Sequence, residues 1–181
     1  KANENMAHAY SHLWKIPITI FRLFTVYGPW GRPDMALFKF VSSILEDKPI
    51  DIYNNGNMYR DFTYIDDVVN GIRLLIDEIP DNLTSKKILK GDSISQVAPY
   101  RLVNIGNSKK IKLIDFIKTI EQVLEKKAVY NFMPFHIGDV KETLADTSLL
   151  KNLTNYRSKT NIREGICNFV DWYRKYYNDF S

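Results

Sequence analysis

Hydrophobic residues follow two different periods along this chain, and each period predicts a kind of secondary structure. Apolar or small residues recur at three- and four-residue steps over Ala2–Trp14, which predicts a helix with one apolar face. Residues 16–24 are instead dense in β-branched and aromatic side chains with little alternation. Such a run predicts a strand that is buried on both faces, as in a parallel sheet.

The same reasoning divides the rest of the chain into short strands and amphipathic helices. The predicted strands are 50–53, 59–64, 101–105 and 129–133, and the predicted helices are 35–46, 66–76 and 113–124, with two more beginning at Asp146 and Asn161. Asp34 is the expected cap of helix 35–46, and Glu164 completes a capping box with Asn161. Residues 80–98 form a long polar loop. The order of elements is mixed α/β, with too few consecutive βα units for a complete doubly wound sheet.

Composition narrows the class of protein. The chain has 181 residues, 45% of them hydrophobic, which is typical of a globular domain. A net charge of +4 is spread thinly among acidic residues, so no nucleic-acid-binding patch is expected. A single cysteine excludes an internal disulfide and favours a cytoplasmic location, and no apolar run is long enough to cross a membrane. The chain opens in what looks like the interior of a helix, which predicts a piece of a longer protein.

Few residues carry an obvious chemistry. The sequence contains no Gly-rich dinucleotide or phosphate loop, no serine nucleophile motif and no Cys/His spacing typical of a metal site. His8 and His12 are spaced for one helix face, but a zinc site lacks further ligands, so a hydrogen-bonded pair is the expectation. Arg32, in a Gly/Pro loop, and Arg60, in an aromatic strand, are candidates for binding a phosphate or carboxylate. The alternative for Arg60 is a structural ion pair with Asp61 or Asp66.

Three stretches carry a family resemblance: Arg-Leu-Phe-Thr-Val-Tyr-Gly-Pro at 22–29, Arg-Asp-Phe-Thr-Tyr-Ile-Asp-Asp at 60–67 and Asn-Ile-Gly-Asn-Ser at 104–108. Together they resemble the extended short-chain dehydrogenase/reductase family of nucleotide-sugar epimerases and dehydratases. The stretches at 30–36, 98–101 and 138–146 are similar to those of UDP-glucuronate 4-epimerases. The resemblance implies the C-terminal part of an extended Rossmann-type fold. Residues 1–29 would end the Rossmann domain, and residues 30–181 would form most of the substrate-binding domain, with short strands returning to the Rossmann sheet.

The resemblance also implies what this chain lacks. In that family a catalytic Tyr-x-x-x-Lys pair lies on the helix that residues 1–14 would continue, with an acidic residue one turn after the lysine. If Glu4 is that acid, tyrosine and lysine both precede Lys1, and Lys1 itself is the alternative for the lysine. No catalytic residue is therefore expected in this chain. The parent protein would use NAD and form a homodimer through the opening helix.

Binding roles carry over position by position. Thr25 matches the position that faces the pyrophosphate or sugar, and Leu23 and Phe24 match positions at the nicotinamide end of the site. Arg32 matches the position that would pair with the glucuronate carboxylate, a group that neutral sugars lack. Four further positions are implied to bind the substrate. Tyr53 would pack on the uracil, and Arg60 would hold the diphosphate. Asp139 would lie near the ribose or uracil edge, and His136 stands where relatives often carry another polar residue or arginine.

The reaction that the resemblance implies is NAD-dependent epimerisation at C4 of a UDP-sugar, with UDP-glucuronate converted to UDP-galacturonate. A decarboxylase or a dehydratase of the same family is the first alternative, because both share the 4-keto intermediate. A non-catalytic module that binds a sugar nucleotide is the second. No metal is expected.

Overall fold

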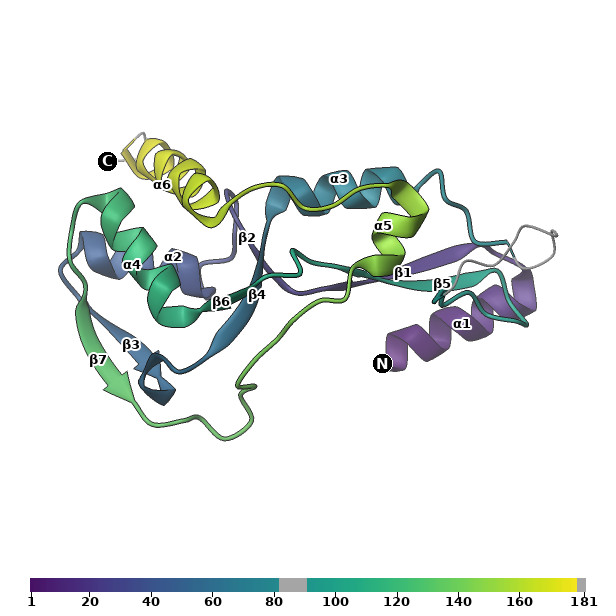
Figure 1. The fold of residues 1–181 in the computed structure, drawn as a ribbon, viewed down its shortest axis with the longest axis horizontal. Helices are drawn as coiled ribbons and strands as arrows, with labels where there is room; N and C mark the ends of the chain where they lie inside the picture. Colours follow the sequence, from purple (N-terminus) through teal and green to yellow (C-terminus); the bar gives the residue numbers. More distant parts are fainter. Residues whose placement is uncertain (82–90, 179–181) are drawn as a thin grey trace.

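The computed structural model describes residues 1–81 and 91–178, which form a mixed α/β fold with parallel strand pairs. The elements follow in the order α1 (Ala2–Trp14), β1 (Ile18–Leu23), β2 (Thr25–Tyr27), α2 (Ala36–Leu45), β3 (Pro49–Tyr53), the 3-10 turn η1 (Asn54–Gly56), β4 (Tyr59–Tyr64), α3 (Ile65–Leu75), β5 (Tyr100–Ile105), β6 (Lys110–Lys112), α4 (Leu113–Leu124), β7 (Val129–Met133), α5 (Ser148–Thr154) and α6 (Ile162–Asn178). Figure 1 shows an elongated molecule with elements gathered at two ends. We call them the sheet lobe and the pocket lobe.

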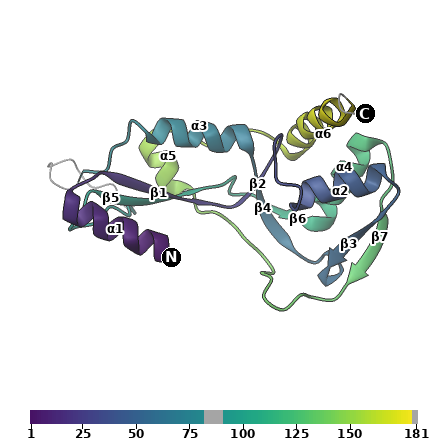
Figure 2. The same cartoon turned by 180° about the vertical axis from the view of Figure 1, so that it is seen from behind.

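The sheet lobe consists of α1, β1, β5, α3 and α5. Strands β1 and β5 pair in parallel over their whole length, from Ile18 opposite Tyr100 to Leu23 opposite Ile105. Its core is small: Val68, Leu75, Val103, Ile105 and Leu150. Helix α1 lies beside this strand pair at one end of the molecule, as Figures 1 and 2 both show.

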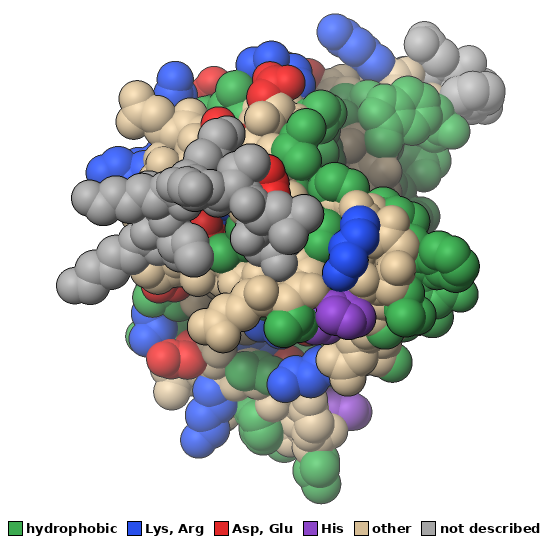
Figure 3. Space-filling view, turned by 90° about the vertical axis from the view of Figure 1, so that its right-hand side faces the viewer, with side chains coloured by type: hydrophobic (Ala, Val, Ile, Leu, Met, Phe, Trp, Pro, Cys, Tyr) green, Lys and Arg blue, Asp and Glu red, His purple; other side chains and the backbone are tan. Residues whose placement is uncertain are grey.

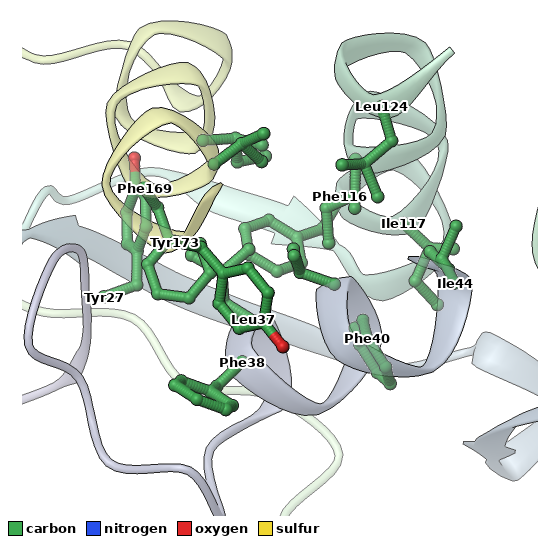
Figure 4. Packing of buried hydrophobic residues seen from close by; sticks show 14 of the residues in the cluster. Tyr27, Leu37, Phe38, Phe40, Ile44, Phe116, Ile117, Leu124, Phe169 and Tyr173 are labelled. Atoms are coloured by element: carbon green, nitrogen blue, oxygen red, sulfur yellow. The ribbon is translucent and has the colours of Figure 1, made fainter. Parts of the chain in front are cut away.

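The pocket lobe consists of α2, β3, α4, β7 and α6. Its helices enclose a large aromatic and aliphatic core in which Phe62 and Phe116 stack with ring centroids 4.0 Å apart. Figure 4 shows side chains of α2, α4 and α6 converging on this core. Strands β3 and β7 form a parallel pair at its edge. The sheet β2-β4-β6 runs between the two lobes and supplies core residues such as Phe62 and Tyr64.

Most of the predicted elements are present with ends shifted by a residue or two. The strands 59–64 and 129–133 and the helices 2–14 and 113–124 have the predicted bounds. Of the predicted capping box, one hydrogen bond is present: the backbone N–H of Glu164 donates to Asn161 Oδ1 at 2.9 Å. Part of the predicted polar loop 80–98, namely residues 82–90, lies outside the described residues.

Three local predictions are wrong. Within residues 16–24, only Ile18–Leu23 form a strand, and none of these residues is fully buried. The reason is that, among residues 1–81 and 91–178, β5 is the one strand that pairs with β1. Asp34 does not cap α2, whose N-cap is Met35 and has no side-chain cap hydrogen bond. The helix predicted to begin at Asp146 begins at Ser148, although Asp146 Oδ1 accepts the Ser148 N–H at 2.9 Å and so still caps its first turn.

Candidate functional site

Eight residues were predicted to bind substrate or cofactor, and the structure distributes all of them over three adjoining pockets. The first, of ≈ 480 Å³, is lined by Thr25, Tyr53, Arg60 and Asp139. The second, of ≈ 520 Å³, is lined by Leu23, Phe24, Thr25 and Arg32. The third, of ≈ 460 Å³, is lined by Tyr53, His136 and Asp139. Because neighbouring pockets share lining residues, the three adjoin one another, and we call them together the long groove.

Arg60 lines the first pocket of the long groove together with Asp139. Its Nη2 donates to Asp139 Oδ1 at 2.8 Å, and its Nη1 donates to the Tyr59 carbonyl at 3.0 Å. The Arg60 side chain is only 18% exposed, whereas that of Asp139 is 37% exposed. The alternative considered for Arg60, a structural ion pair with Asp61 or Asp66, is not what the structure shows: its ion-pair partner is Asp139, from a distant part of the chain. A half-buried guanidinium with donors left over can bind an anion strongly.

The far end of the groove combines an aromatic ring with an imidazole. Tyr53, the last residue of β3, is 37% exposed, and its ring meets that of His136 edge to face with centroids 6.2 Å apart. Asp139 follows His136 through a turn in which the Asp139 N–H donates to the His136 carbonyl. A planar, partly exposed ring next to hydrogen-bonding groups is suited to stacking on a flat heterocycle.

The opposite end of the groove is apolar. Leu23 ends β1 and is 50% exposed, and Phe24 and Thr25 follow where the chain passes from β1 to β2. These residues lie at the carboxyl end of parallel strands, where open α/β sheets bind their ligands. Tyr27 also lines this end, but burial raises the pKa of its hydroxyl well above the usual range, with the nearby Asp67 carboxylate acting in the same direction. Tyr27 therefore stays protonated and is unsuited to act as a base.

Arg32 lies in the loop of residues 28–35 and is held loosely. Its Nη2 is 3.3 Å from Asp34 Oδ2, and both side chains are well exposed, at 74% and 64%. The same nitrogen lies 3.3 Å from Met35 Sδ. Exposed ion pairs contribute little to stability, so this guanidinium can change partner at small cost.

A buried carboxylate fixes the strand that carries Arg60. Asp61 is fully buried and accepts backbone hydrogen bonds from Asn107, Ser108 and Ala145 at 2.8 to 2.9 Å. The Thr63 hydroxyl is a further, longer donor at 3.4 Å. This network joins β4 to the loops that follow β5 and β7, so it orients Arg60 and Asp139 relative to each other. The sequence placed Asp61 beside Arg60 without revealing this role.

Sequence reasoning missed several residues of the groove. Lys39, on α2, lines the first pocket, and no ion pair joins it to any residue of the described ranges 1–81 and 91–178. Asp51, on β3, lines the same pocket and accepts a hydrogen bond from Asn131 Nδ2 at 2.7 Å. In the sequence, Lys39 stands out only as the one cation among the hydrophobic residues of helix 36–45. That pattern does not predict that its side chain lines a ligand pocket.

The two histidines of α1 act as hydrogen-bonding partners. His8 Nε2 lies 2.8 Å from Ser95 Oγ, and His12 Nδ1 donates to the Val97 carbonyl at 2.7 Å. This agrees with the prediction of a hydrogen-bonded pair. Within residues 1–81 and 91–178, no group of three or more histidine, cysteine or acidic side chains is arranged to hold a metal ion. No described helix is long and apolar enough to cross a membrane.

Comparison with known proteins assigns the fold to a family. Residues 1–89 match the model of the NAD dependent epimerase/dehydratase family. A solved structure, UDP-glucuronic acid 4-epimerase from Bacillus cereus in complex with UDP-glucuronic acid and NAD, superposes with a TM-score of 0.81 at 32% identity, covering 97% of this chain and 51% of that one. The part of the chain that this model matches, residues 1–89, belongs to the NAD dependent epimerase/dehydratase family. The mixed α/β fold of the chain matches the Rossmann-like fold of this neighbour.

Relatives in sequence match almost the whole of this chain. A probable UDP-glucuronate 4-epimerase of Rhizobium meliloti is 47% identical over 98% of this chain and 52% of its own length. An uncharacterized 37.6 kDa protein of Escherichia coli O111:H- is 51% identical over 98% of this chain and 53% of its own length. The chain thus spans about half the length of the curated relatives it matches.

Proposed function

We propose that this chain forms the sugar-nucleotide-binding part of an NAD-dependent UDP-sugar 4-epimerase, and that the sugar is glucuronate. The observation that carries the proposal is the long groove, in which Arg60, Tyr53 and Arg32 line adjoining pockets. The chain is similar to the Bacillus cereus enzyme, whose structure contains UDP-glucuronic acid and NAD. This similarity supports UDP-glucuronate as the sugar nucleotide bound here. The naming of relatives as 4-epimerases favours epimerisation over decarboxylation or dehydration.

In this proposal the groove is occupied from its far end inward. The uracil packs on Tyr53 near His136, and Asp139 accepts hydrogen bonds from the ribose or uracil. The diphosphate lies against Arg60, with Lys39 as a second cation within the same pocket. The diphosphate competes with Asp139 for the Arg60 guanidinium, so binding exchanges one charge-assisted hydrogen bond for another.

The sugar then extends past Thr25 into the second pocket. There Arg32 leaves Asp34 and pairs with the glucuronate carboxylate. Because the Arg32–Asp34 pair is exposed, breaking it costs little, and the gain appears only for a sugar that carries a negative charge. Arg32 is therefore the proposed specificity determinant between glucuronate and neutral sugars.

The apolar end of the groove fits the nicotinamide of NAD. Leu23 and Phe24 offer an exposed apolar surface at the carboxyl end of β1, against which a flat ring can pack. When bound, NAD would accept the hydride from the sugar and return it. The described residues of this chain contribute the apolar contact and the grip on the sugar nucleotide, while the proton-transferring tyrosine and lysine are proposed to belong to the parent protein outside this chain.

We further propose that α1 pairs with a second copy in the parent protein. Its outward side carries the exposed side chains of Met6, Tyr10, Leu13 and Trp14, each at least 55% exposed. Figure 3 views this end of the molecule, where hydrophobic side chains gather along one side of the face. Helices that expose such a stripe commonly bury it against another helix.

Calorimetric titration of the chain with UDP, UDP-glucuronate and UDP-glucose tests the proposal. We expect Arg60→Gln to weaken the binding of all three ligands by about tenfold or more, since a charge-assisted hydrogen bond contributes roughly 1.5–3 kcal/mol. Arg32→Gln should leave UDP binding unchanged and remove the preference for UDP-glucuronate. The matched control is Arg174→Gln, on the exposed side of α6, which should change neither.

Each outcome has a defined meaning. If Arg60→Gln binds UDP as the unmodified chain does, the diphosphate does not lie against Arg60 and the proposed orientation is wrong. If Arg32→Gln keeps the preference for glucuronate, another residue reads the carboxylate. If neither UDP nor its sugars bind at millimolar concentration, the chain does not form the proposed site by itself.

A further inference from the structure

The loop that carries Arg32 contains an exposed tryptophan in an unusual backbone conformation. Trp30 has a φ of 61°, in the left-handed region that bulky residues rarely adopt. Its side chain is 74% exposed, so burial of the indole does not offset the backbone strain. A strained backbone conformation persists only where the surrounding contacts hold it. The contacts of Trp30 therefore show what holds this loop in place.

Those contacts are aromatic and come from the C-terminal helix. The Trp30 ring lies 5.4 Å from the ring of Trp172 and 5.3 Å from that of Tyr176, centroid to centroid. Trp172 and Tyr176 stack on each other with an interplanar angle of 25°. Trp172 in turn contacts Phe169, which belongs to the core of the pocket lobe. The three rings, which we call the aromatic clamp, therefore fasten the loop to the rigid part of α6.

Little else ties the middle of this loop to the body of the protein. Its backbone hydrogen bonds are internal: Gly31 N–H donates to the Gly28 carbonyl, and Met35 N–H to the Arg32 carbonyl. Arg32 pairs with Asp34 of the same loop. These hydrogen bonds and this ion pair join residues of the loop to one another, and the ring contacts of the aromatic clamp are its long-range restraint near Arg32.

The second pocket shows why this restraint matters for the ligand. It is lined by Arg32 and Trp30 from the loop, by Thr25 and Phe24 from the strand ends, and by Phe169 from α6. The distance that the Arg32 guanidinium must cross to reach a sugar near Thr25 is set by where the loop is anchored. An anchor two residues away from Arg32 fixes its main chain and leaves its long side chain free to move.

We infer that Trp30, held by Trp172 and Tyr176, is a positioning residue for Arg32, and that α6 thereby sets the discrimination between acidic and neutral sugars. The inference rests on the proposed function for the identity of the sugar. It assigns to the C-terminal helix a part in substrate selection, although none of the clamp residues of α6 contributes a charged group to the groove.

The first test is the ratio of the Kd for UDP-glucose to the Kd for UDP-glucuronate. Trp30→Asn removes the ring and tolerates the left-handed conformation, so the fold is preserved. We expect the ratio to fall by about tenfold, toward that of Arg32→Gln, while the Kd for UDP itself stays unchanged. Trp172→Leu should act in the same direction, and Trp30→Phe should restore most of the ratio. Trp14→Asn, which removes an exposed indole from α1, is the matched control and should leave the ratio unchanged.

The second test needs no ligand. Amide hydrogen exchange of residues 29–35 should become several-fold faster in Trp30→Asn and in Trp172→Leu, with no change in the core of α4. Unchanged exchange in both variants would overturn the inference even if the chain binds no sugar nucleotide. The inference would also be overturned if Trp30→Asn kept the full preference for UDP-glucuronate. If the unmodified chain did not bind UDP at all, that result would instead count against the proposed function.

Discussion

The two lobes of this protein are stabilised in different ways. The pocket lobe encloses an extensive core in which Val41, Ile117 and Ile120 are fully buried. The sheet lobe has a small core, and its helix α1 has Ser11 as its only buried residue. Side-chain hydrogen bonds attach α1 to its neighbours: Glu4 bonds to Arg22, His8 to Ser95 and His12 to Val97. The His8 ring also meets the Tyr100 ring edge to face. The end of the groove near Tyr53 and Arg60 thus lies on the larger core, whereas its apolar end lies where the last residues of β1 meet α2 and α6.

The largest expected effect comes from the core of the pocket lobe. Phe116→Ala removes a fully buried ring that stacks on Phe62 with an interplanar angle of 5°. Such a substitution costs roughly 3–5 kcal/mol through lost burial and the cavity that remains. Urea denaturation followed by tryptophan fluorescence should show the loss, and UDP binding should fall with it. A matched exposed control is Phe132→Ala on β7, whose side chain is 52% exposed and should cost much less.

The next effect tests the link between the lobes. Asp61→Asn replaces a carboxylate that accepts three backbone N–H groups with an amide that has one acceptor oxygen. At least one buried donor is then left without a partner or faces the new NH₂ group, at a cost of about 3 kcal/mol. Both lobes should lose stability together, because β4 joins the loops after β5 and β7. Exchange that accelerates only around residues 107–108 would show that the lobes are not coupled through Asp61.

The contrast between the lobes explains which parts of the fold could be predicted from sequence. Helix 113–124 was predicted with correct bounds because its buried residues follow the helical period. Strand 59–64 was predicted with correct bounds although four consecutive residues are buried, because a turn precedes it and a helix start follows it in the sequence. The strand at 16–24 was predicted as buried on both faces because its composition is that of a central strand. Its residues are half-buried or exposed here, since burial depends on neighbours that local sequence does not specify.

The residues of the candidate site also divide into those that the sequence predicted and those that it did not. The residues Tyr53, Arg60 and Asp139 were predicted by resemblance, and the structure brings them to one pocket, although their contact with a ligand stays a prediction. The Arg60–Asp139 pair could not be derived from the chain alone, because the two residues are far apart in sequence. Lys39 and the aromatic clamp at Trp30 were missed for the same reason: each depends on how α2 or α6 packs against a loop.

A smaller effect on stability, but a clear one on association, is expected at α1. Leu13→Lys places a charge on the exposed apolar stripe, where the native side chain is 68% exposed. Sedimentation velocity of the unmodified chain should show concentration-dependent self-association, and Leu13→Lys should reduce it. Val69→Lys, at a 54% exposed position on α3, is the matched control. Stability should change by less than about 0.5 kcal/mol in either variant, because exposed substitutions have small effects. A monomeric profile of the unmodified chain at high concentration would contradict the proposed pairing of α1.

The smallest effect tests how α1 is attached to β1. Glu4 accepts two hydrogen bonds from Arg22, at 2.8 and 2.7 Å, and this contact holds the pKa of the Glu4 carboxyl below its usual value. A folded-state pKa that lies below the unfolded one contributes stability above the unfolded pKa, and this contribution is lost as the pH falls through the folded pKa. Glu4→Gln should therefore remove a slight stabilisation at neutral pH and flatten the acid limb of the stability profile.

The effect is small because both side chains contact solvent, and added salt should reduce it further. The readout is accordingly local: amide exchange in α1 compared between neutral and acidic pH, in the unmodified chain and in Glu4→Gln. If α1 is attached chiefly by polar contacts, its protection relative to the intrinsic exchange rate should fall on acidification more in the unmodified chain than in the variant. An equal loss of protection in both would mean that Glu4 does not hold α1, and the histidine contacts with Ser95 and Val97 would then carry the attachment.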